Sequence, residues 1–273
     1  MVFFLIIFVI LILLVLSLSG RGGKERFKDF VGVSVAHRGL HDKPHIPENS
    51  IPAFKKAVEK GYGIELDLHL LADGGLAVFH DNTLTRTTGA EGKVKNLTLE
   101  ELKNYHLEGT ENTIPSFDEV LNLIDGKVPL IIELKAESNS AELCKATLAA
   151  LEGYKGAFVI ESFDPRPLMW LKNNRPEITR GQLSQNFVKE PSDLSLPLRL
   201  VLTSMVLNFL TKPDFIAYNF AHRNNIFNNI CLKLWRLQPV VWTIKNERDH
   251  NTATAEGAIS IFEQFEPGGN FYE

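Results

Sequence analysis

The sequence has little cysteine and no excess of positive charge, and both absences restrict the classes of function to consider. Only Cys144 and Cys231 occur in 273 residues, so neither a disulfide framework nor a zinc site with closely spaced ligands is expected. The 29 lysines and arginines are outnumbered by 33 aspartates and glutamates, giving a formal net charge of −4. A basic surface for nucleic acid is therefore not expected.

Charged side chains are also missing from the first twenty residues. From Val2 to Leu16 every residue is apolar, and a helix needs about 20 such residues to cross a bilayer. The alternative is a cleaved signal peptide, but no lysine or arginine precedes the run, and "SLSG" is a poor cleavage site. The pattern therefore predicts an N-terminal transmembrane helix over residues 1–20.

The residues that follow the apolar run indicate its orientation. Four basic residues come directly after it: Arg21, Lys24, Arg26 and Lys28. Because positive side chains tend to remain on the cytoplasmic side, we expect a single-pass protein of the cell membrane whose large domain is cytoplasmic. The predicted division is an anchor at 1–20, a charged linker at 21–30 and one domain at 31–273.

From residue 31 onward, short apolar or β-branched runs alternate with segments of helical periodicity. The runs lie at 31–36, 62–68, 76–79, 129–134, 157–161, 178–183, 214–218, 239–243 and 258–262. Helix-start signals separate several of them, including Ser50 and the capping box of Ser116 with Glu119. This alternation predicts an α/β fold, a TIM-type (β/α)8 barrel. The "ADGG" at 72–75 joins two runs without a helix, so a hairpin should make the barrel irregular there.

Polar side chains stand in or at the ends of the first four runs, where the strands of a barrel converge on one face. They are His37, Arg38, Glu65, Asp67, His80, Glu133 and Lys135. Glu65 and Asp67 are two residues apart and share one face of their strand. Together with Glu133 they can offer three oxygen ligands to Ca²⁺ or Mg²⁺. The alternative is that each carboxylate pairs with a nearby lysine or arginine.

The remaining polar residues of this set suit phosphate chemistry. His37 and His80 can share acid–base work, because the pKa of an imidazole is close to neutral pH. Arg38 and Lys135 offer positive charge to phosphate oxygens. The other histidines are expected to be peripheral, on the surface or structural: His41, His45, His69, His106, His222 and His250.

Taken in order, the motifs form a longer pattern: "HRG", "PENS", "ELD", "DGG", "VFHD", "LTRTTG", "IELK", "ESFDP" and "VVWTIKN". This set, over residues 31–246, resembles the glycerophosphodiester phosphodiesterase family, and most of all its membrane-anchored bacterial branch. The resemblance implies a TIM-type barrel that hydrolyses glycerophosphodiesters to sn-glycerol 3-phosphate and an alcohol, using a divalent cation. It also implies that the substrate's own 2-hydroxyl attacks phosphorus, and that water then opens a cyclic phosphate.

The resemblance assigns roles to individual residues. His37 and His80 become the acid–base pair. Glu65, Asp67 and Glu133 become ligands of Ca²⁺ or Mg²⁺, while Arg38 and Lys135 contact phosphate. Trp242 either packs against the glycerol or fills the barrel. Two alternatives remain: a lysophospholipase D-like or C-like phosphodiesterase of the same barrel group, or a catalytically inactive, membrane-tethered binding module.

Two segments depart from a regular member of that family. Relatives often close with a Thr-Asp pair after the last strand, where this chain has "ISIFEQF", which puts the lip or floor of the substrate pocket in doubt. The stretch 196–210 predicts a helix whose core face is Leu198, Leu202, Met205, Val206 and Phe209. The surplus apolar residues Leu200, Val201 and Leu207 are either covered by the domain or form a second contact with the membrane.

Overall fold

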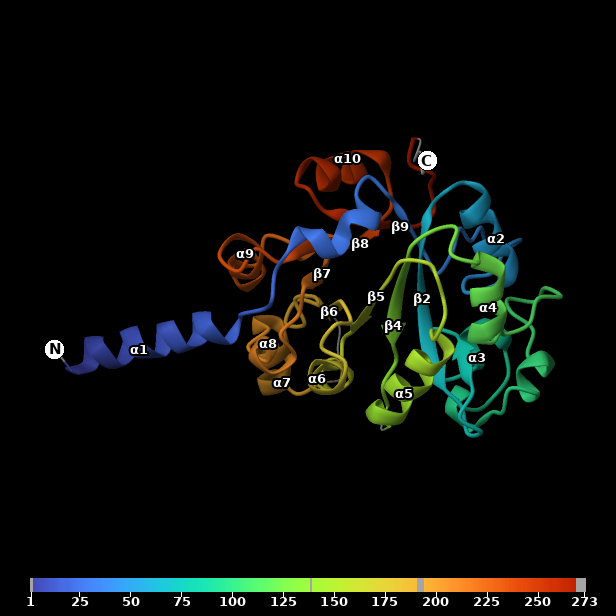
Figure 1. Cartoon of the computed structure of the whole chain (residues 1–273), viewed down its shortest axis with the longest axis horizontal. Coiled ribbons are helices and arrows are strands. Elements are labelled where there is room, and N and C mark those ends of the chain that lie inside the picture. Colours follow the sequence, from blue (N-terminus) through green and yellow to red (C-terminus); the bar gives the residue numbers. More distant parts are fainter. Residues whose placement is uncertain (1, 138, 191–193, 269–273) are drawn as a thin grey trace.

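A closed barrel of parallel strands forms the body of the protein. The computed structural model describes residues 2–137, 139–190 and 194–268. The barrel strands are β1 (Val35–His37), β2 (Gly63–Leu70), β4 (Leu130–Leu134), β5 (Phe158–Ser162), β6 (Arg180–Ser184), β7 (Phe215–Asn219), β8 (Gln238–Ile244) and β9 (Ile259–Phe262). Strand β1 pairs in parallel with both β2 and β9, which closes the ring. The expected TIM-type barrel is therefore confirmed, and helices surround it (Figure 1).

The irregularity of the barrel lies where the sequence predicts it. Strand β3 (Leu76–Val78) runs antiparallel to the end of β2, outside the ring. The segment after β3 forms α3 (Thr85–Thr88) and the 3-10 turns η2 (Val94–Asn96) and η3 (Glu101–Asn104). These short elements enclose a small core of their own that includes Phe79 and Leu102. Each of the nine predicted runs overlaps one strand, and the hairpin is confirmed.

The outer layer is made of helices with the expected caps. The helices are α2 (Ile51–Glu59), α4 (Phe117–Ile124), α5 (Ser140–Ala150), α6 (Pro165–Asn174), α9 (Ile226–Lys233) and α10 (Glu247–Ala255), with the 3-10 turn η4 (Phe220–His222) before α9. The Ser50 hydroxyl accepts a hydrogen bond from the Ala53 amide, and Ser116 with Glu119 forms a complete capping box. These interactions satisfy amides that the first helical turn leaves without partners.

The inside of the barrel changes from apolar to polar along several strands. Val35, Ile131 and Val159 belong to one buried cluster near the end of the barrel at which the strands begin. Two residues further along β1, β4 and β5 stand His37, Glu133 and Glu161, whose side chains line a cavity. Since residues two apart share a face, each of these strands carries an apolar packing residue first and a polar residue nearer its carboxyl end.

The segment 21–30 closes the end of the barrel at which the strands begin, instead of acting as a linker. Residues Lys24–Phe30 form the 3-10 helix η1, and Phe27 and Phe30 are each 2% exposed within the interior cluster. Arg21 and Arg26 both approach Asp214 at the start of β7. The charged composition predicts a solvated connection, but the two phenylalanines, three residues apart on one side of the turn, bury themselves in the barrel.

The apolar N-terminal run forms helix α1 (Val2–Ser17), which projects from the body of the molecule (Figure 1). Leu18 is fully buried beside Ile216 and Cys231, so the chain joins the domain immediately after this helix. At 16 residues α1 spans about 24 Å, less than the roughly 30 Å of a hydrocarbon core. Among the described residues no helix is long and apolar enough to cross a membrane, and the predicted transmembrane helix is not found.

The stretch 196–210 is two helices, α7 (Leu196–Ser204) and α8 (Asn208–Thr211), and not one. Met205 takes a left-handed conformation, with a φ of 52°, and ends α7. The turn changes the phase of the helical pattern, so only part of the predicted core face is correct. Met205 is 3% exposed, whereas Leu198 and Phe209 are 42% and 47% exposed.

Candidate active site

The chain leaves β1 through a turn that directs Arg38 back over the barrel. Arg38 and Gly39 both have positive φ, 56° and 78°, and a side chain at Gly39 would meet the backbone of Ala53 at 3.0 Å. Glycine is therefore required for the close approach of this turn to α2. The Arg38 carbonyl accepts a hydrogen bond from the Asn49 amide at 2.9 Å, which fixes the loop against the barrel.

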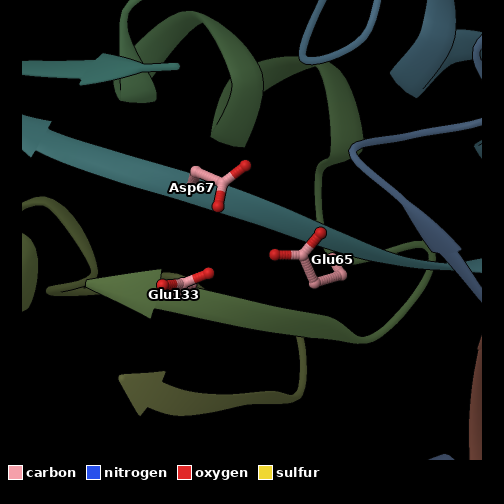
Figure 2. Close-up of side chains that lie close together, drawn as sticks. All are labelled: Glu65, Asp67 and Glu133. Carbon is pink, nitrogen blue, oxygen red and sulfur yellow. The ribbon is translucent and has the colours of Figure 1, made fainter. Parts of the chain in front are cut away.

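Three buried carboxylates converge inside the barrel (Figure 2). Glu65 and Asp67 project from β2 and Glu133 from β4, with one oxygen of each lying within 4.8 Å of the others. All three are at most 6% exposed. The side-chain amide of Asn49 donates a hydrogen bond to Asp67 at 2.8 Å. An all-oxygen donor set at this spacing fits a hard divalent cation.

Two basic side chains neutralise part of this negative charge. Lys135 Nζ lies 3.0 Å from Asp67 and 2.7 Å from Glu133, and Arg38 Nε lies 3.6 Å from Asp67. Burial and the neighbouring carboxylates raise the pKa of Glu65 well above its ordinary value. For Asp67 burial acts in the same direction, but Lys135, His80 and Arg38 outweigh it and hold its pKa well below the ordinary value. Further positive charge between these carboxylates would be favourable.

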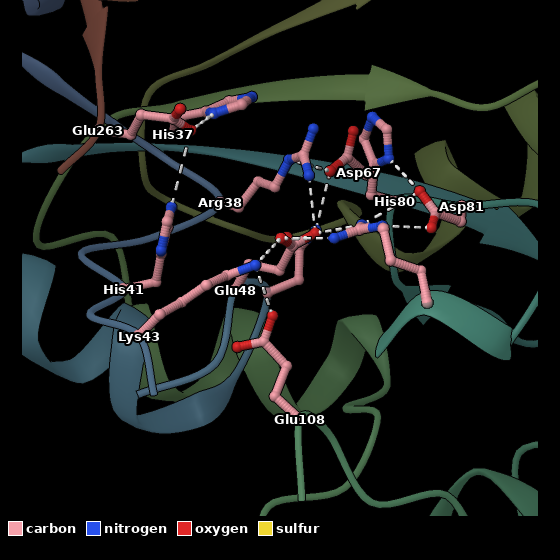
Figure 3. A network of polar contacts seen from close by, with 12 residues as sticks. His37, Arg38, His41, Lys43, Glu48, Asp67, His80, Asp81, Glu108 and Glu263 are labelled. Atoms are coloured by element: carbon pink, nitrogen blue, oxygen red, sulfur yellow. Dashed lines mark hydrogen bonds and ion pairs between the residues drawn. The ribbon is translucent and has the colours of Figure 1, made fainter. Parts of the chain in front are cut away.

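Both predicted catalytic histidines border the same space, and each contacts a carboxylate through Nδ1 (Figure 3). His37 Nδ1 lies 2.7 Å from Glu263, and His80 Nδ1 lies 2.6 Å from Asp81. On its other side, His37 Nε2 lies 3.9 Å from Glu65. Burial lowers the pKa of His37 despite its contact with Glu263, which favours the neutral imidazole.

Glu48 connects the loop after β1 to the segment after β3, close to the two histidines (Figure 3). It accepts hydrogen bonds from Arg38 at 2.7 Å and from Arg86 at 2.6 Å, while Arg86 also binds Asp81 at 2.5 Å. Although burial opposes ionisation, the two guanidinium groups lower the pKa of Glu48 to about 2. The network holds the loop after β1 against the segment after β3.

The space enclosed by these residues is a cavity of about 320 Å³. Ionisable groups line it from β1, β2, β4 and β5 and from the segments after β1, β3 and β9. Apolar side chains line it as well: Phe163, Leu183 and Ile261, of which the last two belong to the buried cluster that contains Val35. Trp242 also lines the cavity; its indole N–H donates to the Ala217 carbonyl at 3.1 Å, and its ring meets Phe163 edge-on at 5.6 Å. Trp242 thus packs inside the barrel and faces the cavity as well.

The structure brings all eight predicted site residues together, and it adds others that the sequence analysis did not single out. His41, expected to be peripheral, is only 6% exposed in its side chain and lies 3.8 Å from Glu263. Glu48, Glu161 and Glu263 also line the cavity. For Glu161 a signal was present: it follows Val159 in β5 as Glu133 follows Ile131 in β4. Glu263 lies in the atypical "ISIFEQF" segment, where no familiar motif marks it.

Known proteins resemble this chain in both sequence and fold. The model of the glycerophosphoryl diester phosphodiesterase family matches residues 37–263. A glycerophosphodiester phosphodiesterase from Caldanaerobacter subterraneus is 38% identical over 175 residues, which cover 59% of this chain and 70% of the relative. An Oleispira antarctica phosphodiesterase, solved in complex with the product sn-glycerol-3-phosphate, has a TM-score of 0.70 at 25% identity, covering 86% of this chain and 93% of its own. A Silicibacter pomeroyi structure, 23% identical with a TM-score of 0.70 over 90% of this chain and 95% of its own, shares the fold.

Proposed function

Because this chain belongs to the glycerophosphoryl diester phosphodiesterase family, we propose that it hydrolyses glycerophosphodiesters to sn-glycerol 3-phosphate and an alcohol. The observation that carries the proposal is a cluster of three carboxylates with two cationic side chains, next to a cavity that both histidines border. The product held by the Oleispira antarctica enzyme is the glycerol phosphate that this reaction would release.

The proposed roles follow from the position of each group. His37 and His80 border the cavity and exchange protons with the attacking hydroxyl group and the departing alcohol. The attacking group is the substrate's own 2-hydroxyl, and a water molecule then opens the cyclic phosphate. Arg38 and Lys135 have N–H donors beyond those used on carboxylates, and these donors contact the phosphoryl oxygens.

Glu65, Asp67 and Glu133 would hold the divalent cation, Ca²⁺ or Mg²⁺. Their shared oxygen chemistry, burial and mutual spacing support this role. When bound, the cation supplies positive charge that stabilises the developing charge on the phosphoryl oxygens. Lys135, bound to two of these carboxylates, keeps them in place beside the phosphate.

The decisive experiment is an activity screen of the purified chain in which both metal and substrate are varied. Glycerophosphocholine and glycerophosphoethanolamine should release glycerol 3-phosphate in the presence of Ca²⁺ or Mg²⁺. The His37→Ala variant, prepared in parallel, should keep only residual turnover, about 10²–10⁴-fold below wild type. Absence of product with every metal and every glycerophosphodiester would refute the function.

A second substrate class is favoured by the apolar side chains that line the cavity. Phe163, Leu183 and Ile261 offer no partner to a polar headgroup but can contact the first methylene groups of an acyl chain. A lysophospholipid is therefore the alternative substrate. Lysophosphatidylcholine in the same screen separates the two, because a lysophospholipase would prefer it to glycerophosphocholine.

The membrane location expected from the sequence is supported by an exposed apolar surface. Residues of α1 such as Phe4 and Phe8 are 75% and 60% exposed, and α1 contacts α8, which follows α7. On α7, Leu196 and Leu200 are 58% and 54% exposed and lie one helical turn apart. We propose that α1 and α7 contact a lipid bilayer, which does not require a helix that crosses it.

We further propose that the domain faces the cytoplasm, as the basic residues after α1 suggest. Two of these residues, Arg21 and Arg26, also bind Asp214 and thus have a structural role. Protease treatment of intact cells tests the orientation: a cytoplasmic domain stays uncut until the cells are permeabilised.

A further inference from the structure

A carboxylate that directly follows the last strand of the barrel contacts one of the two histidines. Glu263 directly follows β9, and one of its oxygens lies 2.7 Å from His37 Nδ1. Its other oxygen lies 2.9 Å from Lys245 Nζ, which follows β8. The Glu263 amide donates to the Ile244 carbonyl at 2.9 Å. Glu263 is therefore held by its backbone, by a cation and by the imidazole; Figure 3 shows it beside His37.

The charge state of Glu263 decides which histidine nitrogen carries the proton. Although burial opposes it, hydrogen bonds from His37, His41 and Lys245 hold the pKa of Glu263 far below its ordinary value. An ionised carboxylate can only accept hydrogen bonds. His37 Nδ1 must therefore be the donor in the 2.7 Å contact with Glu263, and in the neutral ring this leaves Nε2 as a lone-pair acceptor.

The second ring nitrogen of His37, Nε2, faces the cluster of Glu65, Asp67 and Glu133. His37 Nε2 lies 3.9 Å from Glu65, on the side opposite Glu263. A ring rotated by half a turn would instead direct Nδ1 at the cluster and Nε2 at Glu263. Glu263 thus selects both the tautomer and the ring orientation that present a proton acceptor to the cavity.

We propose that Glu263 is a positioning residue, which fixes the His37 imidazole with Nδ1 protonated and Nε2 facing the reacting phosphate. This assignment rests on the proposed function. It also gives the atypical "ISIFEQF" segment a role, because its Glu263 supplies the carboxylate from the end of the last strand. The second histidine has a comparable arrangement, with Asp81 at His80 Nδ1.

The test uses the full chain with Glu263→Ala, Glu263→Asp and the matched control Glu266→Ala. Glu266 lies three residues further on and binds Lys56 and Lys60 at the surface. We expect Glu263→Ala to lower kcat on glycerophosphocholine about 10²–10⁴-fold, as expected when the orienting partner of a catalytic imidazole is lost. KM should change by less than about threefold, since Glu263 acts through His37 and not on substrate. Glu263→Asp should recover at least part of the loss, and Glu266→Ala should behave as wild type.

A double-mutant cycle distinguishes positioning from a general structural role. If Glu263 acts only through His37, adding Glu263→Ala to His37→Ala should cause no further loss of kcat. A kcat for Glu263→Ala within threefold of wild type, or additive losses in the cycle, would overturn the inference.

A measurement without substrate separates this inference from the proposed function. The ¹⁵N chemical shifts of the His37 ring report its tautomer. Wild type should show protonated Nδ1 and bare Nε2, and Glu263→Ala a mixture. A protonated Nε2 in wild type would refute the inference whatever the chain hydrolyses, and an inactive wild type with the expected tautomer would refute only the function.

Discussion

The ring of Phe27 meets the ring of Phe215 edge-on, with centroids 5.4 Å apart. The contact joins η1 to β7 inside the barrel, at the end where the strands begin. It makes the N-terminal segment part of the folded domain, so removing the Phe27 ring should destabilise the whole barrel.

Phe27→Ala should therefore lower the free energy of unfolding by about 3–5 kcal/mol, the usual cost of truncating a buried phenylalanine. Urea unfolding measures the change. The matched control is Phe3→Ala, since Phe3 is 68% exposed on α1. A loss below about 1 kcal/mol for Phe27→Ala would show that residues 21–30 are a linker after all.

Replacing Glu133 by Gln should weaken cation binding and leave the barrel folded. The variant keeps the shape of the side chain but removes a charged ligand. Calorimetric titration with Ca²⁺ and Mg²⁺ in the absence of substrate checks the binding directly. Glu142→Gln is the control, because Glu142 is exposed on α5. Equal cation affinity for wild type and Glu133→Gln would exclude Glu133 as a ligand.

Chelation provides a second measurement on the same site. Dialysis against EDTA should abolish hydrolysis, and Ca²⁺ or Mg²⁺ should restore it. Full activity in excess EDTA after dialysis would exclude a readily exchangeable essential cation.

His80→Ala should remove turnover without unfolding the protein. The His80 side chain is 32% exposed at the edge of the cavity and is not part of the core. A general acid or base contributes roughly 10²–10⁴-fold to the rate, so kcat should fall by that factor while the thermal midpoint stays close to wild type. Near-normal kcat would remove His80 from the proposed mechanism.

Glu48 should make the stability of the protein depend on pH. Its pKa falls on folding from 4.5 to about 2, so its stabilising effect is complete above about pH 4.5 and declines as the pH falls toward 2. The full effect is about 3 kcal/mol, because one pKa unit corresponds to roughly 1.4 kcal/mol.

Glu48→Gln should consequently lose stability at pH 7 and much less at pH 3, relative to wild type at the same pH. Urea unfolding at both pH values measures the difference. Glu59→Gln, at an exposed position 4.0 Å from Lys55, should show little change at either pH. A pH-independent loss for Glu48→Gln would contradict the assigned pKa.

Deleting residues 2–13 should release the protein from liposomes only if α7 is changed as well. The deletion stops before Val15, whose carbonyl binds Trp235, and before the buried Leu18. Leu196→Ser with Leu200→Ser should complete the release. The control is Leu99→Ser, an exposed leucine on the insertion after β3. Release by the deletion alone would show that α7 has no part in binding, and a wild-type chain that does not sediment would refute the contact altogether.

The strands and the carboxylate site could be predicted because each depends on a short-range pattern. Glu65 and Asp67 are two apart on a strand, and that spacing fixes their common face whatever surrounds them. Glu263 depends on a different relationship: it meets His37 only because β9 closes the ring beside β1. A contact between residues 226 positions apart has no local pattern in the sequence.

The differences between expectation and structure at the N-terminus and at 196–210 have a common physical cause. Hydropathy describes how apolar a run is, but not where a tertiary contact ends it. Leu18 does not extend helix α1, because its side chain packs against the domain. At Met205 a single left-handed residue interrupts the helical period. In both places packing against the barrel determines the outcome, and one sequence cannot show it.

Phe27 and Phe30 also restrict how the cavity can be reached. Both rings are 2% exposed in the cluster between the strands, so no passage leads through that end of the barrel. On the proposed function, a glycerophosphodiester and its products would therefore share the opposite end, where the strands stop and the histidines stand.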